Sequence, residues 1–96
     1  MDNWLAITET GAEWRFADGM LYVQSSRGGF YTIRPWVMKI IDRDALPQGT
    51  TIREAIDSGE DSFTPKIGYA IYAGGKDSWR LSTRVVSLEE IELENA

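Results

Sequence analysis

Residues 13–24 read EWRFADGMLYVQ, and this stretch decides the fold class. Trp14 and Phe16 alternate with charged residues before the dipeptide Asp18-Gly19, and a second alternating run follows it. Alternation with a period of two is typical of a strand with one buried face. Asp and Gly both tolerate the positive φ of a type I′ turn, and Asp-Gly between two alternating runs is a strong hairpin signal. The stretch therefore predicts a tight antiparallel hairpin.

Further short strands extend this hairpin along the chain. Each is an alternating or β-prone run bounded by residues that favour turns, such as Gly11 or the pair Gly74-Gly75. The predicted strands are residues 4–9, 13–17, 20–24, 30–34, 66–73 and 78–86. We expect a mainly β fold of the α+β class. Its antiparallel sheet has about five to six short strands, an N-terminal meander plus a C-terminal hairpin, with one short helix packed on it.

The helix is predicted between the two groups of strands. Thr51 and Glu54 have the spacing of a capping box, in which each side chain accepts a hydrogen bond from an amide of the first turn. Gly59 ends the pattern, so the helix covers residues 52–58. Its apolar face consists of Ile52, Ala55 and Ile56. A helix of about two turns depends on packing against the sheet for its stability.

Two segments are open to two interpretations each. Residues 36–42 follow Pro35, which suits the first turn of a helix, but their β-branched residues favour a strand slightly. Residues 87–94 form either a helix with a capping box or a strand. As a strand, this segment would place Glu90, Glu92 and Glu94 on one face, spaced by roughly 6.5 to 7 Å.

The size of the chain limits it to one domain and one core. Its 96 residues are 43% hydrophobic and 26% charged, which is close to ordinary globular usage. A domain of this length needs nearly all of its large apolar side chains inside. We therefore expect a single globular domain over residues 1–96. Trp14 and Trp79, each within an alternating strand, are expected in the core, whereas Trp4 and Trp36 are better candidates for partial exposure.

The absence of cysteine and histidine excludes several kinds of chemistry. Without them the chain has no disulfide, no zinc site of the usual type and no Ser-His-Asp triad. Gly74-Gly75-Lys76 lacks the earlier glycine and the Ser or Thr of a phosphate-binding loop, and residues 57–61 lack the spacing of an EF-hand. We expect no enzyme activity, no cofactor and no metal site.

The charge distribution disfavours nucleic acid and a membrane as direct partners. The net charge is −5, and residues 49–96 carry nine acidic and five basic residues, a net of −4. The ten basic residues are scattered, unlike the basic surface of a nucleic-acid binder. The apolar stretch 36–41 is far shorter than the roughly 20 residues of a membrane span. A cytoplasmic location is the default expectation.

These features together suggest a protein that acts by binding another protein. We expect a partner with a basic surface, such as a nucleic-acid-binding complex, whose groove the acidic residues would occupy. Small phage-type anti-CRISPR or anti-restriction inhibitors are of this general kind. The predicted partner-binding residues are Trp36, Asp57, Glu60, Asp61, Glu89, Glu90, Glu92 and Glu94. The alternative is a structural or adaptor subunit that joins a larger assembly through a sheet edge, and a homo-oligomer is compatible with either function.

Overall fold

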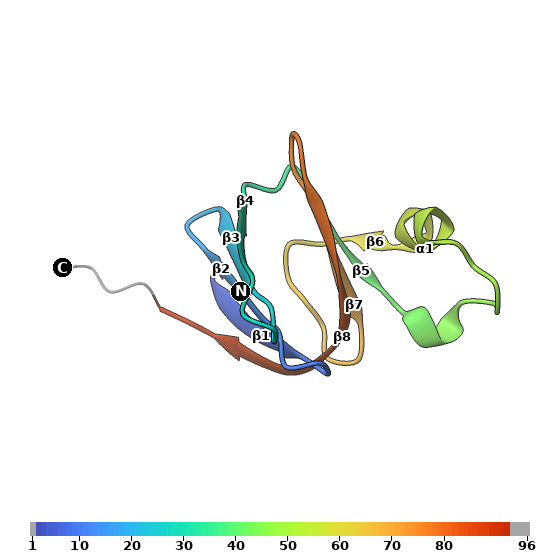
Figure 1. Cartoon of the computed structure of the whole chain (residues 1–96), viewed down its shortest axis with the longest axis horizontal. Coiled ribbons are helices and arrows are strands. Elements are labelled where there is room, and N and C mark those ends of the chain that lie inside the picture. The colour runs from blue at the N-terminus through green and yellow to red at the C-terminus, as the bar shows by residue number, and fades with distance from the viewer. Residues whose placement is uncertain (1, 93–96) are drawn as a thin grey trace.

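The computed structural model describes residues 2–92, which form an eight-stranded antiparallel sheet with one short α-helix (Figure 1). The strand order is β4-β3-β2-β1-β8-β7-β5-β6. The strands are β1 (Trp4–Thr8), β2 (Glu13–Ala17), β3 (Met20–Gln24), β4 (Phe30–Ile33), β5 (Val37–Ile41), β6 (Glu60–Asp61), β7 (Ala70–Gly74) and β8 (Trp79–Glu90). Between β5 and β6 lie a 3₁₀ turn at Arg43–Ala45 and helix α1 (Ile52–Ser58). The predicted fold class is confirmed, although the sheet has more strands than expected.

The long strand β8 joins two halves of the sheet. Its first half pairs with β7 and its second half with β1. The pairing shifts register twice, opposite Ala70/Tyr72 and opposite Ile7/Thr8. Such irregularities bend a strand and increase its twist. β8 therefore passes from one layer to the other, and Figure 1 shows β1–β4 facing β5 and β7 across the interior.

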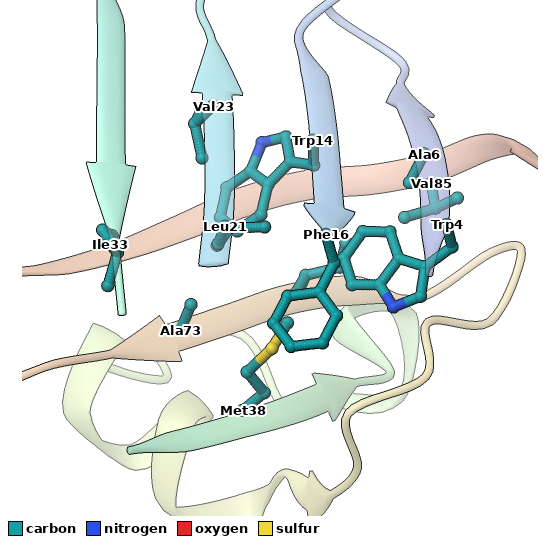
Figure 2. Packing of buried hydrophobic residues seen from close by; sticks show 11 residues of the cluster. Trp4, Ala6, Trp14, Phe16, Leu21, Val23, Ile33, Met38, Ala73 and Val85 are labelled. Carbon is teal, nitrogen blue, oxygen red and sulfur yellow. The ribbon is translucent and has the colours of Figure 1, made fainter. Parts of the chain in front are cut away.

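The hydrophobic core fills the space between these two layers. The rings of Trp4 and Phe16 stack with centroids 5.6 Å apart, and Met38 of β5 approaches them from the opposite layer (Figure 2). The indole N–H of Trp4 donates to the carbonyl of Phe63 at 2.9 Å, which satisfies the polar atom of a fully buried ring. The core cluster comprises Trp4, Ala6, Trp14, Phe16, Leu21, Val23, Ile33, Met38, Ile71, Ala73 and Val85.

The hairpin predicted from residues 13–24 is confirmed in detail. Asp18 and Gly19 both have positive φ, 54° and 76°, and Ala17 lies opposite Met20. These values are those of the type I′ turn. In both segments the strand interpretation is confirmed in part, because residues 37–41 form β5 and β8 continues to Glu90, while residues 91–92 follow the strand. The predicted position Glu94 lies outside the described residues.

One predicted strand begins later than expected. The run 66–73 was predicted to alternate throughout, but strand β7 starts only at Ala70. Gly68 has a φ of +90°, and its N–H donates to the carbonyl of Val85. The chain therefore turns at Gly68 before it enters the sheet, and Ile67 is exposed in this turn.

Two of the four tryptophans are placed differently from the prediction. Trp14 is buried as predicted, but Trp79 is 50% exposed because it starts β8 on the uncovered outer face of the sheet. Trp4 is fully buried because β1 lies in the middle of the sheet, between β2 and β8. Trp36 is 69% exposed in the connection between β4 and β5.

Helix α1 packs on the outer face of β5. Ala55 is buried, and Gly59, which follows the helix, lies so close to β5 that a Cβ there would be 2.9 Å from Cγ1 of Ile41. Thr51 and Glu54 form the predicted capping box. The apolar face of the helix is only partly covered, because Ile52 is 56% exposed.

The capping box makes the stability of α1 dependent on pH. The Thr51 hydroxyl donates to the Glu54 carboxylate at 2.8 Å and the Thr51 N–H at 3.2 Å, and these bonds lower the pKa of Glu54. A carboxylate with a lowered folded-state pKa stabilises the fold above its unfolded-state pKa, and this contribution is lost as pH falls through the folded-state pKa.

We expect Glu54→Gln to be less stable than the native chain at neutral pH and equally stable in acid. Thermal unfolding followed by circular dichroism over a pH series measures this difference. In a Thr51→Ala background the same substitution should have a smaller effect, because the hydroxyl donor is absent. An equal pH dependence in both backgrounds would contradict the role of the capping box.

Candidate partner-binding site

An open groove lies between α1 and the outer face of β7 and β8. Two adjoining hollows share Ile52 and Trp79, and the larger has a volume of about 640 Å³. We call this surface the α1–β8 groove, defined by Arg43, Ile52, Ile56, Tyr72, Trp79 and Leu81. The exposed surface of its lining is mainly apolar, although Arg53, Asp57, Asp77 and Arg80 also line it.

The groove exists because α1 covers only part of the sheet. Side chains of a strand alternate between the two faces, so Tyr72 points outward while its neighbours Ile71 and Ala73 enter the core. Tyr72 and Trp79 lie with ring centroids 6.2 Å apart. The seven-residue helix packs on β5 and does not cover these two rings. Trp79 and Ile52 are therefore left half-exposed on opposite sides of the groove.

The end of the molecule that carries α1 is acidic. Residues 42–61 contain six acidic and two basic residues, a net charge of −4. Asp57 lines the groove, and Glu60 and Asp61 are exposed in β6, which follows the helix directly. One of the predicted partner-binding residues, Asp57, therefore lines the groove, whereas Glu60 and Asp61 lie in β6, beyond β5, where consecutive residues point to opposite faces of the sheet.

The other predicted acidic residues lie elsewhere. Glu89 and Glu90 end β8, opposite Leu5 and Trp4 of β1, and Figure 1 shows this end of β8 far from α1. Because they are consecutive in a strand, Glu89 and Glu90 point to opposite faces of the sheet. Glu92 follows the strand and is exposed. The structure thus does not bring the two predicted acidic groups together.

Trp36 lies at the same end of the sheet as Trp79. The Trp36 N–H donates to the carbonyl of Gly74 at 2.8 Å, and Gly74 pairs with Trp79 on its other side. Since neighbouring strands are about 4.8 Å apart, the backbones of the two tryptophans are separated by roughly 10 Å. Two exposed indoles therefore flank β7, one of them predicted from the sequence and one not.

Residues 2–92 show no group of three or more acidic side chains arranged to hold a metal ion.

Arg84 is the centre of an ion-pair network, with Asp44 at 2.7 Å and Glu9 at 3.2 Å. Hydrogen bonds to Asp44 and Glu9 raise the pKa of Arg84, so this network joins the 3₁₀ turn to the β1–β2 connection. Within the described part of the chain, no helix is long and apolar enough to cross a membrane.

Comparison of the chain with protein-family models, with curated proteins and with solved structures gives no match. The surface features that bear on function are the α1–β8 groove, the acidic residues of α1 and β6, and the outer strands of the sheet.

Proposed function

We propose that this chain is a non-enzymatic protein-binding module that holds its partner in the α1–β8 groove. The observation that carries the proposal is the half-exposed Trp79, which stands beside Tyr72 and lines an open groove together with Ile52 and Asp57. Trp and Tyr are enriched among the residues that dominate binding energies. A contiguous exposed apolar surface on a small domain is a typical interaction site.

The lining of the groove defines the chemistry of the partner. An apolar side chain of the partner would be buried between Trp79 and Ile52, where it removes both from water. Basic side chains of the partner would face Asp57 in the lining and, beyond the helix, the acidic residues of β6, whereas Arg43, Arg53 and Arg80 of the lining would face its polar or acidic groups. Such complementary charges increase the rate of association and select against acidic competitors. The partner is therefore a protein with a basic surface and a protruding apolar residue.

Replacing Trp79 by alanine should weaken partner binding by about 30-fold or more, the equivalent of about 2 kcal/mol. The partner is first identified by affinity capture, and its dissociation constant is then measured by calorimetry for each variant. The matched control is Phe30→Ala, because Phe30 is 61% exposed on β4, away from the groove. Equal affinities of the Trp79→Ala variant and the native chain would contradict the proposal.

A narrower form of the proposal concerns the kind of partner. The net charge of −4 in residues 42–61 supports an inhibitor of a nucleic-acid-targeting system, of the phage-type anti-CRISPR or anti-restriction kind, which acts in the cytoplasm and occupies a basic groove. Nucleic acid should then compete with this chain for the partner. Reversing Asp57, Glu60 and Asp61 to lysine should abolish the competition. Reversing Glu89 and Glu90 is the matched control, and an equal loss there would show that the contact is not confined to the α1 end.

The alternative is an adaptor subunit that joins its assembly through the backbone of an outer strand. One observation favours it, namely that β4 forms an outer strand without charged residues. Different substitutions would therefore impair the two functions. Trp79→Ala leaves backbone pairing intact, whereas a proline in β4 leaves the groove intact.

A further inference from the structure

The two outer strands of the described sheet differ in how they are protected. β6 has two residues, Glu60 and Asp61, and both are acidic and exposed. Shortness and charge are two of the features that prevent an outer strand from pairing with another chain. β4 is twice as long and lacks the protection by charge, because residues 30–33 read FYTI, without a charged residue or proline. Phe30 and Tyr31 are also exposed. The edge of β4 is therefore the part of the sheet best suited to pairing.

The backbone groups available at this edge can be deduced from the pairing of β3 with β4. The Ser25 N–H donates to the carbonyl of Gly29 at 2.7 Å. Hydrogen-bonded and non-bonded pairs alternate along an antiparallel ladder, so Val23–Tyr31 and Leu21–Ile33 are the next bonded pairs. The N–H and C=O groups of Phe30 and Thr32 consequently point away from β3. No turn or loop hydrogen bond within residues 2–92 uses them.

We propose that β4 pairs antiparallel with β4 of a second copy of this chain, around a two-fold axis at Tyr31. Phe30 then lies opposite Thr32 of the second copy, and the two residues exchange both N–H to C=O hydrogen bonds. The symmetric pair does the same on the other side of the axis. All four outward-pointing N–H groups of the two strands are satisfied in this arrangement.

The sequence of β4 is complementary to itself in this register. Tyr31 faces its own equivalent, and Phe30 faces the β-branched Thr32, which are favourable cross-strand pairs. Arg34 falls opposite Gly28 and so does not meet its own copy, and the guanidinium of Arg80 lies 4.1 Å from the centroid of the Tyr31 ring. The segment 42–61, which carries the net charge of −4, lies at the opposite edge of the sheet, next to β5 and including β6. The excess negative charge therefore lies away from the contact.

Two-fold symmetry makes this contact closed, so association stops at a dimer. Each copy contributes one strand of four residues, and the surface area that so short a strand buries is smaller than that of a stable permanent interface. The dimer is therefore expected to depend on protein concentration. Because the groove lies at α1, β7 and β8, dimerisation through β4 leaves it open to a partner.

The mass of the full chain should rise with concentration from 10.8 kDa towards twice that value in sedimentation equilibrium. Thr32→Pro should remain monomeric over the same range, since it removes an N–H that only the second copy uses. Proline is tolerated on an outer strand where its N–H position faces solvent, and thermal unfolding verifies the fold. Thr32→Val is the matched control, because it keeps the N–H and should still dimerise. A native chain that stays at 10.8 kDa throughout would overturn the proposal.

Cross-linking tests the same contact without a proline. The chain contains no cysteine, so a single introduced thiol can form a protein–protein disulfide only with its copy, through a mixed disulfide with glutathione that the second thiol displaces. In the proposed register, Cα atoms of the non-bonded Tyr31 pair are about 4.5 Å apart, within the range of a disulfide. With oxidised glutathione, Tyr31→Cys should form a covalent dimer at least tenfold faster than Asp61→Cys in β6. Equal rates would show that random collision, and not β4 pairing, brings the copies together.

Discussion

Trp4→Ala is expected to lower the free energy of unfolding by about 3–5 kcal/mol. The side chain is fully buried, stacks on Phe16 and donates its indole N–H to the carbonyl of Phe63. Alanine would leave a cavity between the two layers and would remove the donor to the Phe63 carbonyl. Urea denaturation followed by circular dichroism measures the change.

Trp36→Ala provides the control for this substitution, since it removes the same side chain from an exposed site. Its effect should be within about 0.5 kcal/mol. Because a small domain has only about 5–15 kcal/mol of stability, Trp4→Ala could leave too little folded protein to measure. Trp4→Phe keeps a ring but loses the hydrogen bond to Phe63, so its loss of stability should be intermediate. Similar losses at Trp4 and Trp36 would contradict the described core.

The parts of the fold that could be predicted are those set by neighbouring residues. The turn at Asp18-Gly19 requires two positive φ angles, and the capping box joins residues three apart. Both signals are complete within a few residues of sequence. The alternation of residues 13–24 likewise fixes which side chains enter the core, because a strand with one buried face has a period of two.

The parts that could not be predicted depend on pairing between distant segments. Nothing near Trp4 indicates that β1 is central, because that position results from pairing with β8, at the other end of the chain. The same holds for Trp79, which alternates like a core residue but lies on the outer face that α1 leaves uncovered. One local signal for the exposure of Trp79 was present in the sequence. Trp79 lies opposite Gly74 in the β7–β8 hairpin, so no side chain of β7 covers it at that position.

The candidate site was predicted only in part, for the same reason. Asp57, Glu60 and Asp61 are close in sequence, and in the structure they lie at the end of α1 and in the strand that follows it, with Asp57 lining the groove. Glu89 and Glu90 are separated from them by the path of β8. Tyr72 and Trp79, which form the apolar part of the groove, become neighbours only through the β7–β8 hairpin. Charge clusters could thus be found from sequence, whereas the apolar surface between elements could not.

The path of β8 depends on one buried hydroxyl group. Opposite the register shift at Ala70/Tyr72, the N–H of Ile71 donates to the side-chain oxygen of Ser82 at 2.8 Å. The same hydroxyl donates to the carbonyl of Thr83 at 2.6 Å. The side chain of Ser82 thereby satisfies a backbone group that the irregular ladder leaves without its usual partner. This bonding allows β8 to leave β7 and continue along β1 without an unpaired amide in the interior.

Ser82→Ala should lower the free energy of unfolding by about 1–3 kcal/mol, because it leaves the buried N–H of Ile71 without an acceptor. The exchange rate of the Ile71 amide proton should rise in the same variant, which links the loss to this group. Ser87→Ala is the matched control, since Ser87 is exposed on the same strand and should change stability by less than about 0.5 kcal/mol. If Ile71 kept its native protection in Ser82→Ala, the bend would have another support. Loss of that protection would show that the Ser82 hydroxyl supports the bend of β8, which places the two layers and Trp79 at the groove. The alternating pattern alone would assign this serine to a polar face.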